Sequence, residues 1–135
     1  MFIVLTVLAL VGVTTMDALA KARRVSWHKV EVPGEPDSKQ VSRQFKRLLK
    51  QKSRRVKWGK GDQLKLHARV TKMQWRESKD VLRLTLTVVG RIEGGKGARS
   101  HIRVGGRPNQ RKKLRTQALS IVAEGLVTRL STLSR

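Results

Sequence analysis

Three segments in the second half of the chain alternate between inward and outward residues, and this pattern constrains the fold more than any other feature. The expected inward positions are Leu64, Leu66, Ala68 and Val70, then Leu82, Leu84, Leu86 and Val88, then Ala98, Ser100, Ile102 and Val104. A period of two is typical of strands with one buried face. Polar residues 77–80 and the glycine-rich residues 94–97 separate the segments, so an antiparallel meander is the simplest pairing.

Two other segments have helical spacing. In the first, Asp37 or Ser38 is a suitable cap because a side-chain oxygen there can accept from the free N–H groups of the first turn. Its apolar face contains Val41, Phe45, Leu48 and Leu49, and the helix should end near residue 53. The second is expected to begin after a cap at Asn109 and to carry an apolar stripe from Leu114 to Leu133.

A short strand is expected at residues 25–32, before a turn at residues 33–37. The predicted order is therefore β-α-β-β-β-α. Two amphipathic helices can cover one face of a mostly antiparallel sheet, which makes a two-layer α+β domain. Because no repeat or linker divides it, residues 21–135 are expected to form a single basic domain.

The N-terminal segment differs sharply in composition from the rest. Residues 2–13 are predominantly apolar, residues 1–20 contain no Lys or Arg, and Ala18-Leu19-Ala20 precedes Lys21. An apolar core followed by small-x-small is typical of a cleaved export signal, here residues 1–20. The alternatives are cleavage after Ala22, a retained membrane anchor, or a buried first helix. The apolar core is shorter than the roughly 18 to 20 residues that a spanning helix needs.

Charge and cysteine content limit the function classes. The chain has 31 Lys and Arg, 9 Asp and Glu, a formal charge of +22 and no cysteine. Without cysteine, a disulfide framework, a thiolate nucleophile and a lipid-modified cysteine are excluded. The positive charge favours polyanions as partners. The alternative is charge that serves only solubility.

The outward positions of the three alternating segments are the main candidate site. If the apolar partners face the helices, one sheet face presents Lys65, His67, Arg69, Arg83, Arg99, His101 and Arg103, with Thr71, Thr85 and Thr87 among them. Arginine can donate two parallel hydrogen bonds to a phosphate or carboxylate. We predict a polyanion-binding face here, against the alternative of an ordinary solvated sheet surface. Arg111, Lys112 and Lys113 at the start of the last helix are further candidates.

The sequence gives little support for catalysis or a cofactor. His67 and His101 would need a third metal ligand, and no carboxylate is expected on their face. The carboxylates fall mostly in turns and form no acid/base pair. Residues 90–97 nearly match a phosphate-binding loop, but they lack its final Ser or Thr and connect two strands, so a hairpin is expected. We therefore expect a non-enzymatic protein without a metal or cofactor.

The three tryptophans, Trp27, Trp58 and Trp75, lie in or near strand ends. They are expected to cover the edges of a small core. The alternative role is that of interfacial anchors or stacking platforms.

The layout also resembles a group of envelope proteins. A strand such as Leu64–Thr71 after a helix, and a closing helix such as Gln117–Leu130, are similar to the α/β domains of outer-membrane assembly lipoproteins, including the curli-secretion pore and the penicillin-binding-protein activators. The resemblance covers roughly residues 25–133. This chain differs in having no lipid-accepting cysteine and a far more basic composition. The resemblance implies an envelope scaffold or binding module without catalysis.

A second resemblance covers residues 38–133. Their α-β-β-β-α order is that of the double-stranded-RNA-binding domain, in which a basic start of the last helix contacts phosphates. Arg111, Lys112, Lys113 and Arg115 lie in a similar place. The extra first strand, the long elements and an export signal all argue against an RNA partner.

We therefore expect an exported binding or assembly module of the cell envelope, periplasmic or extracellular. Its expected partner is an anionic envelope polymer, an anionic lipid or an acidic protein. Binding to an anionic lipid would be a peripheral contact with the membrane. The alternatives are a nucleic-acid-binding domain and a structural envelope protein with incidental charge. The sequence leaves the ligand and the oligomeric state open.

Overall fold

The computed structural model describes residues 23–34 and 37–135. The elements are β1 (Val25–Glu31), α2 (Ser38–Ser53), β2 (Leu64–Ser78), β3 (Val81–Ile92), β4 (Gly97–Gly106), a short 3-10 turn (Pro108–Gln110) and α3 (Arg111–Ser134). The predicted order and the two-layer α+β architecture are confirmed. The predicted signal, residues 1–20, and the alternative cleavage point after Ala22 lie outside the described residues.

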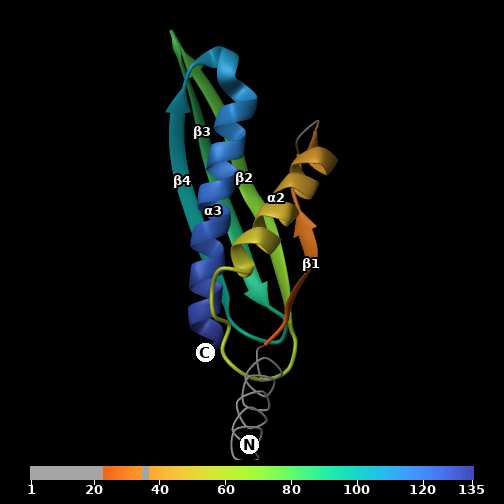
Figure 1. The fold of residues 1–135 in the computed structure, drawn as a ribbon. Coiled ribbons are helices and arrows are strands. Elements are labelled where there is room, and N and C mark those ends of the chain that lie inside the picture. The colour runs from red at the N-terminus through yellow and green to blue at the C-terminus, as the bar shows by residue number, and fades with distance from the viewer. Residues whose placement is uncertain (1–22, 35–36) are drawn as a thin grey trace, which may run out of the picture.

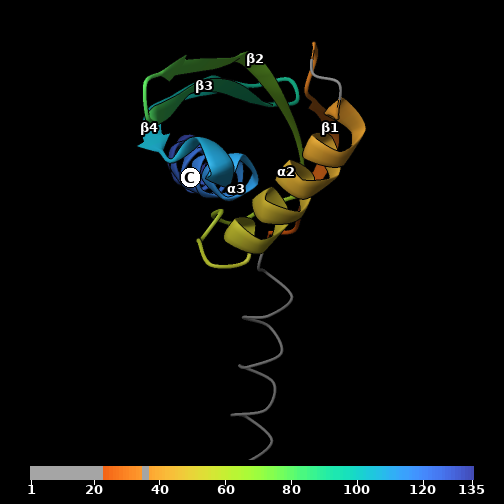
Figure 2. The same ribbon diagram turned by 90° about the horizontal axis from the view of Figure 1, so that it is seen from above.

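The four strands form one sheet in the order β1-β2-β3-β4. β1 pairs parallel with β2 through the α2 crossover, and β2, β3 and β4 form the predicted antiparallel meander. Both helices lie on the same side of this sheet, and the sheet arches over α3 (Figures 1 and 2). The other face is left uncovered by both helices.

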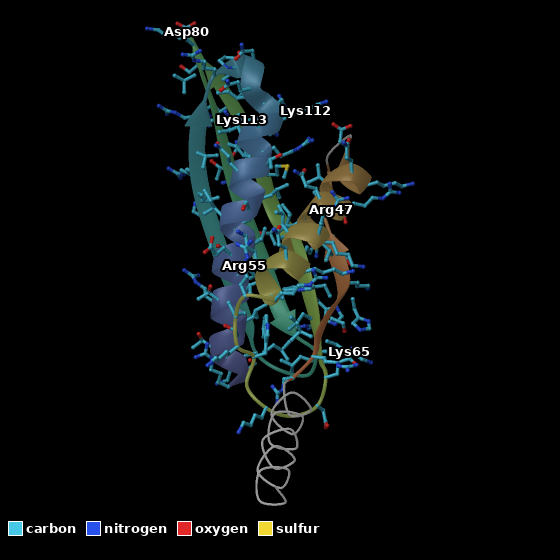
Figure 3. The ribbon with its side chains drawn as sticks, viewed as in Figure 1. Arg47, Arg55, Lys65, Asp80, Lys112 and Lys113 are labelled. Carbon is cyan, nitrogen blue, oxygen red and sulfur yellow. The ribbon has the colours of Figure 1, made fainter. Side chains whose placement is uncertain are left out.

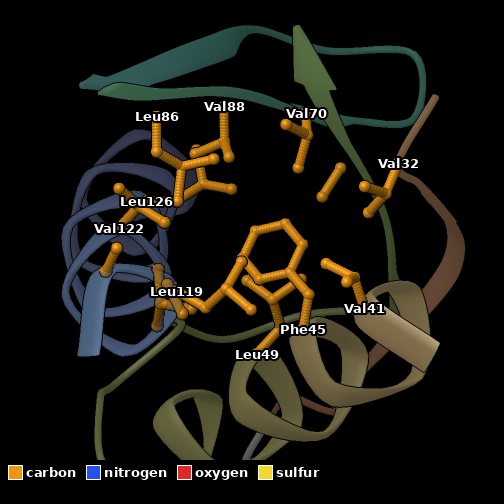
Figure 4. Close-up of a cluster of buried hydrophobic side chains, with 14 of the residues drawn as sticks. Val32, Val41, Phe45, Leu49, Val70, Leu86, Val88, Leu119, Val122 and Leu126 are labelled. Atoms are coloured by element: carbon orange, nitrogen blue, oxygen red, sulfur yellow. The ribbon is translucent and has the colours of Figure 1, made fainter. Parts of the chain in front are cut away.

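The core lies between the helices and the sheet. α2 contributes Val41, Phe45 and Leu49, which are fully buried at the expected spacing of four residues. Phe45 points into the space between α3 and the sheet (Figure 4). α3 buries a broader surface because it packs against β3, β4 and α2 together.

Two glycines permit the close approach of α3 to the sheet. A Cβ at Gly90 on β3 would lie 2.9 Å from the methyl groups of Leu126 and Leu130. A Cβ at Gly125 on α3 would lie 2.8 Å from the hydroxyl of Ser100 on β4. Real Cβ atoms do not approach other atoms this closely, so a side chain at either position would force the facing Leu or Ser side chains to shift.

Two tryptophans are part of this core. Trp27 and Trp58 are only 3% and 5% exposed. The indole N–H of Trp27 donates to Ser53 Oγ, and that of Trp58 donates to the Ser53 carbonyl, both at 2.9 Å. Ser53 in turn donates to the Leu49 carbonyl. The expectation that tryptophans cover core edges is therefore confirmed for these two.

The predicted helix caps are wrong in their chemistry. Asp37 does occupy the N-cap position of α2, but its side chain makes no capping hydrogen bond and instead lies near Arg115. Asn109 does not cap α3, because it lies inside the 3-10 turn and Gln110 precedes the helix. Pro108 stabilises that turn by fixing its backbone dihedral at the first position.

Candidate functional site

The sheet surface opposite the helices, which we call the outer face, carries the predicted basic side chains. Leu66, Ala68 and Val70 point into the core, so the alternate residues of β2 point outward. By the same alternation and the observed register, the structure places all seven predicted residues there: Lys65, His67, Arg69, Arg83, Arg99, His101 and Arg103. The three threonines lie around the middle of this face. Thr85 is half-buried and Thr87 is buried, whereas Thr71 is exposed.

A β-bulge adds residues that the sequence pattern missed. Between Val70 and Lys72 the pairing of β2 with β3 shifts by one residue. Beyond this bulge Met73 and Trp75 pair with the core residues Leu86 and Leu84 and lie on the helix side. Lys72, Gln74 and Arg76 therefore lie on the outer face. The signal was present in the sequence, because the apolar residues Val70 and Met73 are three positions apart, whereas residues on one face of a regular strand are an even number of positions apart.

Two more cations and one carboxylate belong to the outer face. Arg91 pairs with His67 and Gly97, and Lys29 pairs with His67 from the other side. Glu31 on β1 lies 3.9 Å from Arg69 and 4.0 Å from Lys29. The expectation that this face has no carboxylate is therefore wrong. Glu31 lies at the β1 edge, so the charge of the β3 and β4 part remains uncompensated among the described residues.

Two hollows open on the outer face, one toward each end of the strands. The first has a volume of about 660 Å³, and its lining includes Arg69, Arg91, Arg99, His67, Val89 and Gly97. The second has a volume of about 460 Å³, and its lining includes Arg76, Arg83, Arg103, Lys72, Gln74 and Thr85. Guanidinium groups in such hollows can donate to several oxygens of one phosphate or carboxylate.

The histidines do not gather into a metal site. His67 on β2 and His101 on β4 are separated by β3, as the predicted strand order required. His101 shares a 2.6 Å hydrogen bond with Thr87, and the ring centroid of His67 lies 6.3 Å from that of His28. Within residues 23–34 and 37–135, no three His, Asp or Glu side chains form a metal-binding group.

The basic start of α3 lies on the helix side of the sheet, away from the outer face. The Arg111 guanidinium stacks 4.3 Å above the Trp75 ring, and Arg115 is largely buried with Nη1 3.8 Å from Asp37. Lys112 and Lys113 are exposed (Figure 3). Two of the four cations that suggested phosphate contacts in the manner of a double-stranded-RNA-binding domain thus have contacts within the fold.

The outer face is not the only basic surface. α2 exposes Lys39, Arg43, Arg47 and Lys50, and Arg55 follows the helix (Figure 3). Two of them, Lys39 and Arg43, line a hollow together with Ser38, Ser42 and Glu31. The outer face differs because adjacent strands hold its arginines in a fixed register beside threonine and glutamine.

Residues 90–97 form a hairpin between β3 and β4, as expected. Its turn contains Gly94 with a φ of +72°, a left-handed conformation that favours glycine. The Gly95 N–H donates to the Ile92 carbonyl within this turn. No helix follows the loop, so it lacks the helix N-terminus that a phosphate-binding loop uses.

Comparison with known proteins gives likeness in structure alone. No protein-family model and no curated protein matches this chain. A candidate lipoprotein from Caulobacter crescentus CB15 is similar over 80% of this chain and 85% of its own, with a TM-score of 0.49 and 11% identity. A minor lipoprotein from Acinetobacter baumannii is similar over 84% and 94%, with a TM-score of 0.46 and 16% identity. Likeness at this level carries no argument about function.

No helix within residues 23–34 and 37–135 has both the length and the apolar composition of a membrane-spanning segment.

Proposed function

We propose that the protein is an exported, non-enzymatic binding or assembly module of the cell envelope that contacts an anionic envelope component through the outer face of its sheet. Export is supported by the apolar N-terminal segment and its small-x-small end. The resemblance to envelope-assembly domains, stated from the sequence, supports the same compartment. Both of these arguments for an envelope location come from the sequence. The binding surface of the proposal is the outer face.

The observation that carries the proposal is the charge of this face. It presents nine basic side chains beside the carboxylate of Glu31: Lys29, Lys65, Arg69, Lys72, Arg76, Arg83, Arg91, Arg99 and Arg103. So many like charges on one surface repel one another and attract counter-ions, and a bound polyanion relieves that repulsion. An acidic protein surface is the alternative partner with the same chemistry.

A charge-matched pair of variants tests the proposal. The triple variant Arg69→Gln, Arg83→Gln, Arg103→Gln removes three outer-face charges. The control Arg43→Gln, Arg47→Gln, Arg55→Gln removes three charges at or near α2 and leaves the outer face intact. All six side chains are exposed, so each substitution should change the free energy of unfolding by no more than about 0.5 kcal/mol.

Binding is measured against anionic lipid vesicles, lipopolysaccharide and cell-wall fragments at two salt concentrations. We expect binding to weaken with salt because charge neutralisation releases counter-ions. The outer-face triple variant should bind more weakly, with a smaller salt dependence, and the α2 control should bind like the unmodified protein. Equal losses in both variants would show that net charge alone, rather than this face, determines binding.

A further inference from the structure

The basic side chains of the outer face fall into two groups. The first cluster consists of Arg69, Arg91 and Arg99, and the second of Arg76, Arg83 and Arg103. Arg69 and Arg99 pair with Val89 from opposite sides, and Arg91 is two residues further along the same strand. In the second cluster Arg76 pairs with Arg83, and Arg103 pairs with the neighbouring Thr85.

Each cluster has its own hollow, and each hollow has a glycine on β4. Gly97 stands opposite Arg91 in the first cluster, and Gly105 stands opposite Arg83 in the second. Because glycine has no side chain, the outer face is open beside an arginine at both places. The two hollows, about 660 and 460 Å³, share no lining residue.

The middle of the outer face separates the clusters and has a different chemistry. Thr87 and His101 occupy it, joined by their hydrogen bond, and Thr71 donates to the Thr87 carbonyl. Lys72 on β2 pairs with Thr87 and lines the second hollow, so it borders the middle on that side. The centres of the two clusters are about six residue steps apart along the strands. At ~3.4 Å per residue this separation is roughly 20 Å. A single phosphate or a single headgroup can therefore occupy only one of them.

We propose that the two clusters are paired subsites for one flexible, linear polyanion that carries phosphate groups along its chain. This inference rests on the proposed function of the outer face and names the class of ligand. Phosphate suits the forked donors of arginine, and a chain with repeated charges can reach both clusters. The sheet arches over α3, so its outer face is convex across the strands (Figure 2). A flexible chain follows such a surface, whereas a rigid duplex would touch it over a smaller area.

The clusters are not equivalent. Glu31 lines the first hollow and lies 3.9 Å from Arg69, whereas no carboxylate lines the second. The second cluster should therefore bind a single short anion more tightly. Glu31→Gln should strengthen binding at the first cluster and leave the second unchanged.

The test compares a short and a long probe of the same chemistry: tripolyphosphate, which reaches one cluster, and long-chain polyphosphate, which spans both. Occupying both clusters with one chain should raise affinity by about 100-fold or more, because the second contact becomes intramolecular. Three variants are measured: Arg69→Gln with Arg91→Gln, Arg83→Gln with Arg103→Gln, and all four together. Arg43→Gln with Arg47→Gln on α2 is the charge-matched control, and tryptophan fluorescence with thermal unfolding verifies folding.

The unmodified protein should bind long-chain polyphosphate more tightly than tripolyphosphate. We expect each single-cluster variant to lose this difference in affinity, while it still binds tripolyphosphate at the other cluster. If the gain persists in either cluster variant, the paired-subsite inference is overturned, but the proposed function stands. If the fourfold variant binds both probes as the unmodified protein does, the proposed function fails as well. Tighter binding of duplex DNA than of long-chain polyphosphate would overturn the assignment of a flexible chain.

Discussion

The indole N–H of Trp27 on β1 and the hydroxyl of Ser53 at the end of α2 form a buried hydrogen bond of 2.9 Å. The same serine accepts the indole N–H of Trp58 through its carbonyl oxygen. One small residue at a helix end thus satisfies two buried donors, which would otherwise have to lie in the core without partners.

Replacing Ser53 with alanine should lower the free energy of unfolding by about 1 to 3 kcal/mol, because the Trp27 N–H would lose its acceptor while remaining buried. The measurement is urea unfolding followed by tryptophan fluorescence. Ser78→Ala, at the exposed end of β2, is the control and should change stability little. An Ser53→Ala protein as stable as this control would show that the Trp27 indole finds another partner.

Gly90→Ala should destabilise the protein by about 1 to 3 kcal/mol, because the added methyl group would lie 2.9 Å from Leu126 and Leu130. Gly105→Ala on β4 is the matched control, since its Cβ would have only ordinary contacts at 3.9 Å. That control should be neutral or slightly stabilising, by up to about 1 kcal/mol. Thermal unfolding of both variants measures the difference, and equal melting temperatures would refute the close packing of α3 on β3.

Arg115 should contribute mainly through its packed stem. Its side chain is 11% exposed, whereas that of Asp37 is 62% exposed, so solvent screens their 3.8 Å ion pair. Arg115→Met keeps most of the packing and should stay within about 0.5 kcal/mol of the parent. Arg115→Ala removes the stem and should cost about 1 to 2 kcal/mol. Chemical unfolding at low and high salt separates the two effects, and a large salt-dependent loss in Arg115→Met would contradict this reasoning.

The mature protein should begin at Lys21, because Ala18 and Ala20 supply the small residues that a signal peptidase requires. Amino-terminal sequencing of protein from the native cell measures this directly. A start at Arg23 would indicate cleavage after Ala22. Intact Met1 in a soluble cytoplasmic fraction would argue against export and favour a nucleic-acid partner.

Elements with a regular hydrophobic period could be predicted from the sequence. The helix over residues 38–53 and the strands around Leu66, Leu84 and Ile102 were predicted because burial of one face imposes that period. The helix caps could not be predicted as easily. The side chain of Asp37 lies near Arg115, which is 78 positions away in the sequence, instead of capping α2. A contact over this distance cannot be predicted from the residues next to Asp37.

The candidate site was predicted only where the alternation stays regular. Lys65, His67 and Arg69 precede the bulge and were placed correctly. Lys72 and Arg76 follow it and were missed, because unbroken alternation from the inward Val70 would place them on the core side. Glu31 was missed because the strand predicted at residues 25–32 was assigned no neighbour in the sheet, and its parallel pairing with β2 brings Glu31 beside Arg69.

The bulge after Val70 makes the length of β2 as important as its composition. If Thr71 were accommodated by regular alternation instead of the bulge, Met73 and Trp75 would turn toward solvent, and Lys72 and Arg76 would turn toward α3. The extra residue held in the bulge thus decides which residues are core and which are surface over half a strand. The spacing of residues in this segment is therefore part of the information that places charged side chains on one side of the sheet and apolar side chains on the other.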